Sequence, residues 1–326
     1  DSTWAKPGDT VFVKFLANEA LDNLDIIISN SISSYIDDGA ANYRGYHIME
    51  EDDEEGEIQF NIEYTDIGGA TGPSSNSTTD GTIVKYDKTI PEITNIRMSS
   101  NNSLIDSAAI GDVDSLFFTS SEMQRNVLVS LADSIITPLQ NSLDFIATRE
   151  LLEDDTDGWI SFSITLEDSA GNSTGQINET DDGSGVWFDG TYPELTTVSF
   201  NSSNINDPGL AIEGDTLFLD FISTEELSLI SISIAGNQAD TTFQTEFRTS
   251  YRSIYVMNGS ENEGYIPLQI DFSDLVGNQG QTITSTTNGT SILFDMTPPI
   301  DFQIDTIIVS GGNVIENYWN ASNDSI

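Results

Sequence analysis

The chain has 326 residues, in which 54 Asp and Glu outnumber 10 Lys and Arg, so its formal net charge at pH 7 is −44. Such a surface repels nucleic acid, because binding to phosphates requires Lys and Arg. The absence of cysteine excludes disulfide bonds and thiolate metal sites. The sequence also contains no run of about 20 apolar residues, the length that a helix needs to cross a membrane. We therefore expect neither a nucleic-acid partner nor membrane insertion.

The charge has two competing explanations. Acidic surfaces that are poor in lysine stay soluble in salty water, and acidic side chains also bind hard divalent cations. Disorder is a third interpretation, but 37% of the residues are hydrophobic and many of them alternate with polar residues. Because the chain starts with Asp rather than Met and has no signal-peptide pattern, we expect a processed chain or an internal piece of a longer one.

A six-residue pattern, aromatic-Asp-x-Thr-x-Pro, occurs three times, at residues 86–91, 188–193 and 294–299. Its aspartates are 102 and 106 residues apart, a period that is too long for a solenoid and that suits a string of small domains. We interpret the pattern as the joint between domains. The predicted division is three domains, here called the first, second and third repeats, and a remnant: residues 1–87, 88–189, 190–295 and 296–326.

The predicted elements are strands with one apolar face. Early in the first repeat, Val11, Val13 and Phe15 alternate with Phe12, Lys14 and Leu16. In the third repeat, Leu217, Leu219 and Phe221 take the same places. Phe15 aligns with Phe118 and Phe221, so we expect all three in the core. A period of two with one apolar face predicts antiparallel sheets that cover each other. The expected fold is all-β: tandem immunoglobulin-like β-sandwich domains in an elongated rod.

Acidic residues recur in the three repeats at constant intervals. A glutamate follows each Gly-Asp aspartate by ten residues: Glu19, Glu122 and Glu225. An aspartate follows a later glycine of each repeat by ten residues: Asp66, Asp168 and Asp274. The joint aspartate comes 21 residues after that: Asp87, Asp189 and Asp295. Intervals held constant over three copies indicate one fold repeated.

An immunoglobulin-type sandwich brings these acids together at the joints. The loops that carry Glu122 and Asp168 lie where the chain enters the second repeat, beside the joint aspartate Asp87. The acidic loop at residues 50–55 lies where the chain leaves the first repeat, and it adds candidate ligands at the same joint: Asp52, Asp53 and Glu55. The next joint repeats the arrangement with Asp155, Asp157, Asp189, Glu225 and Asp274, and Glu263 precedes the third joint. Asn172 and Asn278 close the loops after Asp168 and Asp274 and are candidate amide ligands.

Several carboxylates without a lysine or arginine among them repel one another by roughly 1 kcal/mol per pair at about 4 Å in water. A hard cation with six to eight oxygen ligands removes that cost. Mg²⁺ requires stricter octahedral geometry, so acids on loops favour Ca²⁺. We therefore expect Ca²⁺ at the junctions between domains; the alternative is that these acids are solvated loop tips.

The joints, the Gly-Asp pairs and the loops from Asp168 to Asn172 and from Asp274 to Asn278 resemble tandem bacterial Ig-like repeats of long secreted surface proteins and adhesins. The resemblance covers residues 1–310, and acids at domain junctions are similar to those of cadherins by analogy only. It implies a non-enzymatic extracellular or cell-surface structural protein, often stiffened by Ca²⁺. The first repeat departs from the pattern, because Ala70 stands where the others have asparagine.

The ends of the chain are out of phase with the repeats. The first repeat lacks the strand-like segment that follows the other joints, and residues 300–310 supply a spare one after the third joint. Either a long protein was divided out of phase, or residues 300–326 of one molecule complete the first repeat of the next and build a filament. Partners are accordingly expected to be further repeats or neighbouring copies.

Other signals are weaker. His47 is the only histidine and its neighbours place it in an ordinary strand, so we expect no catalytic site. Trp159 and Trp187 are expected to cover the edge of a core, and as an alternative they form a platform for binding surface glycans. The order of hypotheses is a Ca²⁺-stiffened structural repeat, then a self-assembling filament, then a carbohydrate-binding module.

Overall fold

A computed structural model of the chain describes residues 3–306, and every regular element in it is a β-strand. Within that range no helix has the length and apolar character needed to cross a membrane. By their contacts the residues form two compact units, Asp1–Tyr192 with Ser273–Gln279, and Pro193–Phe272 with the residues from Gly280 onward. Three separate hydrophobic cores lie within residues 5–86, 96–188 and 198–294. The division into domains made from the joints stays a prediction, and each core falls within one repeat.

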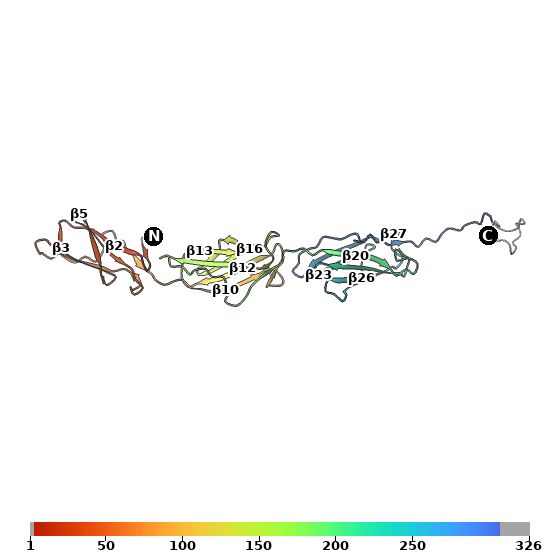
Figure 1. Cartoon of the computed structure of the whole chain (residues 1–326), viewed down its shortest axis with the longest axis horizontal. Helices are drawn as coiled ribbons and strands as arrows, with labels where there is room; N and C mark the ends of the chain where they lie inside the picture. The colour runs from red at the N-terminus through yellow and green to blue at the C-terminus, as the bar shows by residue number, and fades with distance from the viewer. Residues whose placement is uncertain (1–2, 307–326) are drawn as a thin grey trace, which may run out of the picture. The chain divides into compact units, whose positions relative to one another are not determined.

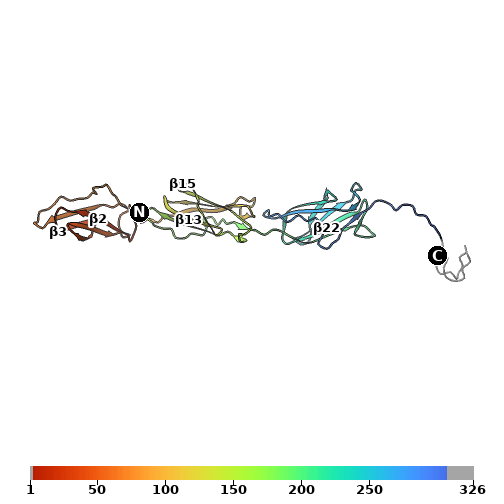
Figure 2. The same ribbon diagram turned by 90° about the horizontal axis from the view of Figure 1, so that it is seen from above.

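The second repeat shows the complete arrangement. Its four-stranded sheet has the order β10-β12-β16-β15, the facing sheet β14-β13-β18, and a small third sheet β11-β19-β17. In Figure 1, β12 and β16 run side by side, and in Figure 2 β15 lies at the edge. Its strands are β10 (Ile93–Ser100), β11 (Ser107–Ala108), β12 (Val113–Ser120), β13 (Gln124–Leu131), β14 (Ser134–Ile136), β15 (Leu139–Asn141), β16 (Asp144–Glu150), β17 (Gly158–Trp159), β18 (Phe162–Asp168) and β19 (Trp187–Phe188).

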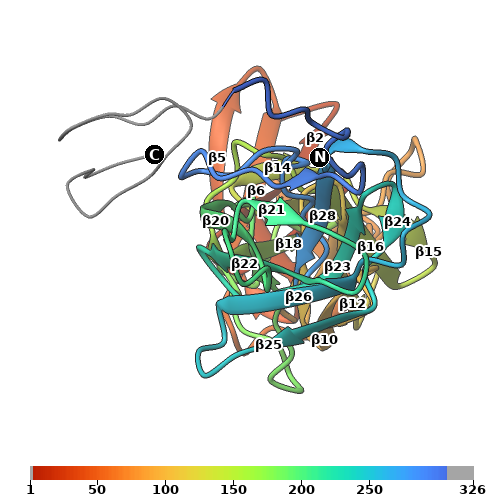
Figure 3. The same cartoon turned by 90° about the vertical axis from the view of Figure 1, so that its right-hand side faces the viewer.

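The third repeat has the same topology. Its sheets are β20-β22-β26-β25, β24-β23-β28 and β21-β29-β27, and Figure 3 shows β26 and β25 as neighbours at one edge. Its strands are β20 (Leu195–Ser202), β21 (Leu210–Ala211), β22 (Thr216–Ser223), β23 (Leu227–Ile234), β24 (Asn237–Gln238), β25 (Thr241–Gln244), β26 (Ser250–Val256), β27 (Gly264–Tyr265), β28 (Leu268–Asp274) and β29 (Leu293–Phe294).

The first repeat differs in one sheet. Its sheets are β2-β6-β5, β4-β3-β8 and β1-β9-β7, so the sheet that has four strands in the other repeats has three here. Its strands are β1 (Trp4–Ala5), β2 (Thr10–Leu16), β3 (Leu21–Ile28), β4 (Ser31–Ile32), β5 (Ser34–Gly39), β6 (Asn42–Ile48), β7 (Gly56–Glu57), β8 (Phe60–Asp66) and β9 (Lys85–Tyr86).

The alternating apolar residues form the cores as expected. Phe118 is 2% exposed and Phe221 is 1% exposed, and each stacks on an aromatic residue of the neighbouring strand. The residues of the two facing sheets belong to one cluster in each repeat, which makes each repeat an immunoglobulin-like β-sandwich. Phe15 packs against the first core but is only half-buried.

The joint pattern has a physical explanation. Its aromatic residue is 1% exposed in every copy and anchors the last strand in the core. The aspartate accepts the backbone N–H of the threonine two residues later, at 3.1 Å in the second joint, between Asp189 and Thr191. The threonine hydroxyl donates to the carboxylate of Asp157, at 2.7 Å, and Glu55 and Glu263 accept from the other two joint threonines. These bonds fix the chain as it leaves each sandwich.

Asp114 is an exception in the core of the second repeat. It is 0% exposed on β12, at the position that Val11 and Leu217 occupy in the other repeats. One carboxylate oxygen accepts the N–H of Ser115 at 2.9 Å, and the other has no hydrogen-bond partner among the described residues. Burial raises the pKa of Asp114 to about 6, against the effect of the Ser115 bond. Burying a carboxylate that has one oxygen without a hydrogen-bond partner costs stability.

We expect Gly280→Ala to lower the free energy of unfolding of the third repeat by about 1–3 kcal/mol, the usual cost of overpacking a core. A Cβ at Gly280 would lie 2.1 Å from Cε2 of Phe272. The second repeat has the smaller pair Leu166 and Thr174 at these positions. Phe272→Leu in the same chain should therefore recover stability that Gly280→Ala removes, in a double-mutant cycle measured by urea unfolding. A cost of Gly280→Ala that is equal in both backgrounds would contradict this explanation.

Candidate metal centre

Three acidic side chains meet at the joint between the first and second repeats. Asp87 follows β9, Glu122 lies in the loop after β12, and Asp168 ends β18. One carboxylate oxygen of each lies within 4.8 Å of the other two. Asp168 is 0% exposed, and the other two are half-buried. The structure thus brings together three residues that are far apart in the sequence.

The loop after β18 fixes Asp168. Its Oδ1 accepts the backbone N–H of Gly171 at 2.7 Å and of Asn172 at 2.9 Å. Gly171 has φ of +94°, a conformation that favours glycine, and it lets the chain turn back toward the carboxylate. The side-chain amide of Asn172 donates to Oδ2 of Asp168 at 2.8 Å and to the backbone carbonyl of Asp87 at 3.0 Å. Asn172 therefore connects Asp168 to the joint through its amide N–H groups, and its assignment as a metal ligand through the amide oxygen stays a prediction.

The electrostatics of the cluster are unfavourable when no cation is bound. Burial raises the pKa of the Asp87 carboxyl above its ordinary value, and the negative charges of Asp168 and Glu55 raise it further, against the hydrogen bond from the Thr89 N–H. Burial likewise raises the pKa of Glu122, followed by the charges of Asp87, Asp168 and Glu55. The charges that raise these two pKa values all come from acids. A cation in the cluster would replace this repulsion with attraction.

The oxygen atoms that the cluster offers as ligands suit a hard cation. The three carboxylates have six oxygens in all. The two N–H bonds to Oδ1 of Asp168 occupy the lone pairs of that atom, whereas Oδ2 accepts one bond and keeps a lone pair for a cation. Carboxylate and carbonyl oxygens are the ligands that Ca²⁺ and Mg²⁺ prefer, and loop acids suit the more flexible coordination of Ca²⁺. These residues therefore fit Ca²⁺, with solvent water completing the coordination.

The first compact unit contains part of a second such arrangement. Asp274 accepts the N–H groups of Gly277 and Asn278, at 2.6 and 2.9 Å. The side-chain amide of Asn278 donates to Oδ2 of Asp274 and to the backbone carbonyl of Asp189, both at 2.8 Å. Burial raises the pKa of Asp189, and the charges of Asp274 and Asp157 add to the effect, against a bond from the Thr191 N–H. Glu225 follows β22 at the position equivalent to Glu122.

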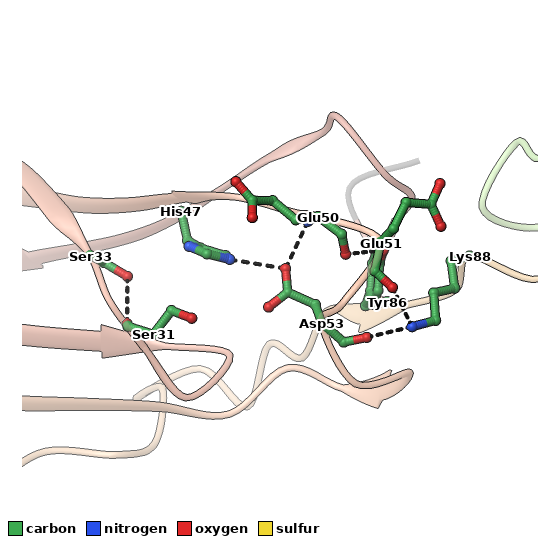
Figure 4. Close-up of polar contacts among 8 residues, drawn as sticks. All are labelled: Ser31, Ser33, His47, Glu50, Glu51, Asp53, Tyr86 and Lys88. Carbon is green, nitrogen blue, oxygen red and sulfur yellow. Dashed lines mark hydrogen bonds and ion pairs between the residues drawn. The ribbon is translucent and has the colours of Figure 1, made fainter.

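The acidic loop of the first repeat has internal partners, which Figure 4 shows. Oδ2 of Asp53 lies 3.0 Å from Nε2 of His47 and accepts the N–H of Glu50 at 2.8 Å. Lys88 Nζ donates to the backbone carbonyls of Glu51 and Asp53, at 2.6 and 2.9 Å. Asp53 thus fastens its loop to β6, which gives His47 a structural partner.

An equivalent contact between a strand residue and an acid of the following loop occurs in the other repeats. Arg149 forms an ion pair with Asp155 at 2.6 Å, and the hydroxyl of Tyr255 donates to Glu261 at 2.7 Å. Burial and the Arg149 pairing act in opposite directions on Asp155, and its pKa is lowered. In all three repeats the partners are six residues apart, so Asp53 and Asp155 serve their own loops. The sequence did not reveal this role, because the strand residue changes from His to Arg to Tyr.

The remaining candidates lie apart from the cluster or at its border. Glu55, Asp157 and Glu263 are exposed and hold the joint threonines and the preceding N–H groups. Oδ1 of Asp66 accepts the N–H of Ala70 at 2.8 Å, and Oδ1 of Asp295 accepts that of Thr297 at 3.0 Å. Asp52 and Glu19 are exposed. Their assignment as metal ligands stays a prediction.

Two tryptophans form a separate surface feature on the second repeat. Trp159 is 68% exposed and Trp187 is 44% exposed, and their rings meet edge to face with centroids 5.5 Å apart. Trp159 also lines a hollow of ≈ 480 Å³ whose polar walls include Asn178, Glu179 and Thr180. The two indoles therefore cover the core less than the sequence suggested.

No protein-family model and no curated protein sequence matches the chain. Among solved structures, it is similar to a 1.5-MDa bacterial ice-binding adhesin studied for host cell surface retention, with 16% identity, 90% of this chain and 94% of that chain covered, and a TM-score of 0.43. It is also similar to a Ca²⁺-stabilized adhesin with which an Antarctic bacterium binds ice: 14% identity, 87% and 70% covered, TM-score 0.49. SGBP-B of the Bacteroides ovatus mixed-linkage glucan utilization locus, in complex with a mixed-linkage heptasaccharide, gives 14% identity, 90% and 66% covered, and a TM-score of 0.19.

Proposed function

We propose that the chain is a non-enzymatic structural part of an extracellular, adhesin-type or fibre-type surface protein, in which Ca²⁺ at the joints holds successive Ig-like repeats in line. The observation that carries the proposal is the cluster of Asp87, Glu122 and Asp168 within 4.8 Å. Asp87 belongs to the joint, whereas Glu122 and Asp168 belong to two loops of the repeat that follows. An ion bound to all three would fix the direction in which the second repeat leaves the joint.

The proposed ion would stiffen the joint by neutralising the repulsion between the three carboxylates. Without it, three carboxylates repel one another, and the joint reduces the repulsion by opening. With it, opening the joint costs the binding free energy. Modules outside the cell typically bind Ca²⁺ with dissociation constants of about 10⁻⁴–10⁻³ M, which suits a protein that meets millimolar Ca²⁺ only after secretion.

The test combines small-angle scattering and thermal melting of the full chain in Ca²⁺ and in EDTA, both in about 1 M NaCl, where the Debye length is about 3 Å. The proposal predicts a longer maximum dimension and a higher melting temperature in Ca²⁺, and no Ca²⁺ response of the first joint in Glu122→Gln. Glu153→Gln, which removes an exposed acid of the same repeat, is the matched control. An unchanged particle in both solutions would reject calcium stiffening.

A second candidate function is glycan binding by the exposed tryptophan pair. Indole faces stack on sugar rings, and polar groups beside them supply orientation. Retention of the chain on an immobilised β-glucan should be lost in Trp159→Ala and kept in Tyr265→Ala, which removes the exposed aromatic residue at the equivalent position of the third repeat. Equal retention of both variants would exclude this candidate.

A further inference from the structure

One edge of the first repeat is open. In the second repeat β10 pairs antiparallel with β12, and in the third β20 pairs antiparallel with β22. The equivalent strand of the first repeat, β2, pairs with β6 on one side. Within residues 3–306 no strand pairs with its other side. A free strand edge offers a row of backbone N–H and C=O groups to another chain.

The core beneath this edge is incompletely covered. Leu116 and Leu219, which lie opposite Met98 and Phe200 on the covering strands, are 0% exposed. Val13 occupies the same position on β2 and is only half-buried. The first core contains nine buried apolar residues, compared with fifteen and eighteen in the others. Without a covering strand, apolar residues of the first core such as Val13 are therefore less buried than their equivalents in the other repeats.

A loop forms the other wall of the place that the strand occupies in the complete repeats. In the second repeat the N–H groups of Ile96 and Met98 donate to Asp181 Oδ2 and Ser184 Oγ, at 2.9 and 2.8 Å. In the third repeat those of Val198 and Phe200 donate to Thr287 Oγ1 and Thr290 Oγ1, at 2.9 and 3.0 Å. The covering strand is thus held from both sides.

The first repeat retains this loop. Thr79 and Thr82 stand at the two acceptor positions. The hydroxyl of Thr78 donates to the carbonyl of Thr82 at 2.9 Å, the bond that closes the loop in the other repeats between Thr180 and Ser184 and between Thr286 and Thr290, both at 2.7 Å. The first repeat therefore has both walls of a strand-binding groove, β2 and residues 78–82.

The segment that suits this groove follows the third joint. In the covering strands, apolar residues occur at Ile93, Ile96 and Met98 and again at Leu195, Val198 and Phe200, and an asparagine follows the last by four residues. Ile304, Ile307 and Val309 repeat the spacing, and Asn313 follows by four. Ile304 is 72% exposed and lies in no strand.

We propose that the groove between β2 and residues 78–82 binds residues 304–310 of a second copy of this chain, so that copies associate head to tail. In the complete repeats the covering strand comes directly after a joint and covers the repeat that follows it. The third joint of one copy, continued in the same direction, leads into the first repeat of the next. The same junction places Asp295 of one copy with Glu19 and Asp66 of the other, the positions equivalent to Asp87, Glu122 and Asp168.

The alignment fixes the register of the association. Ser115 lies opposite Ser99 in the second repeat, and Phe218 lies opposite Asn201 in the third. The equivalent pair is Phe12 with Ser310 of the second copy. Because the chain has no cysteine, Phe12→Cys with Ser310→Cys introduces a specific disulfide reporter, since facing residues of neighbouring strands have Cβ atoms close enough for a bridge.

The experiment is oxidation of the full-length double-cysteine chain at high salt, followed by non-reducing electrophoresis. The expected result is a ladder of multimers, with little in the control Ile32→Cys with Ser310→Cys, whose cysteine replaces an exposed residue of β4. Ile307→Asp with Val309→Asp, added to the reporter, should abolish the ladder and leave the melting of the second and third repeats unchanged. Sedimentation of the unmodified chain should show association that increases with concentration.

Two outcomes overturn the proposal. A cross-linked monomer in place of the ladder means that the tail of the same molecule occupies the groove. The second outcome is that multimers are no more abundant than in the Ile32 control and that the chain sediments as a monomer at every concentration. The tail then does not bind in the groove, as would be the case if a segment preceding residue 1 supplied the strand. Oxidation is repeated in EDTA, where the ladder should persist, so a failure of the calcium sites is distinguished from a failure of strand addition.

Discussion

Replacing Asp114 with leucine is expected to raise the free energy of unfolding of the second repeat by roughly 3 kcal/mol at pH 7. The pKa of this carboxyl is raised from 3.8 to about 6 by burial, and each unit corresponds to about 1.4 kcal/mol between the two protonation states. Leucine carries no charge into the core and matches Leu217 of the third repeat. Urea unfolding of the two proteins at pH 7 measures the difference.

The pH dependence gives a sharper form of the same prediction. Because the folded pKa is higher than the unfolded one, the folded state binds the proton more tightly, and the contribution of Asp114 is fully present below pH 3.8 and is lost as the pH rises through about 6. The advantage of Asp114→Leu should therefore shrink as the pH falls from 7 to 4. Glu150→Gln removes an exposed acid from the neighbouring strand and should show no such change. A constant difference between pH 7 and pH 4 would contradict the conclusion that the buried Asp114 is charged at pH 7.

The second large expected effect is that calcium reverses the order of stability of the unmodified chain and the Glu122→Gln variant. At a free Ca²⁺ concentration of 100 times the dissociation constant, each site should raise the free energy of unfolding by about 2.7 kcal/mol. Glu122→Gln should lose the contribution of the first site. In EDTA the same variant should be slightly more stable than the unmodified chain, because it removes one of three charges that repel each other and that raise the pKa of Asp87 and Glu122.

Glu122 is the suitable residue for this comparison, because Asp168 also holds its own loop through Gly171 and Asn172. Urea unfolding in Ca²⁺ and in EDTA gives the four free energies needed. A variant that is less stable than the unmodified chain by the same amount in both solutions would assign Glu122 a purely structural role.

The sequence predicted the architecture well, because the repeat supplied three copies of each signal. Alternating apolar residues placed Phe118 and Phe221 in the cores, where they are found. The constant intervals singled out Asp87, Glu122 and Asp168, which the structure brings within 4.8 Å of each other. That they bind a metal stays a prediction.

Other features depend on conformations that spacing does not reveal. Asp53 and Asp155 share the acidic loops with exposed neighbours, and only the fold of the loop turns them toward His47 and Arg149. Between residues 20 and 50, where β3 to β6 lie, the sequence indicated a strand only around His47. The buried charge of Asp114 was not predicted, although alignment with Val11 and Leu217 places it at a core position.

The most direct test of the calcium site is isothermal titration calorimetry of the full chain with CaCl₂ in about 1 M NaCl, beside Glu122→Gln and the control Glu153→Gln. At this salt concentration, diffuse attraction to the overall charge is screened. We expect saturable binding that is preserved in Glu153→Gln and that loses the first-joint site in Glu122→Gln. Unsaturable heats that are the same in all three proteins would contradict it, and the net charge of −44 would then reflect adaptation to salt.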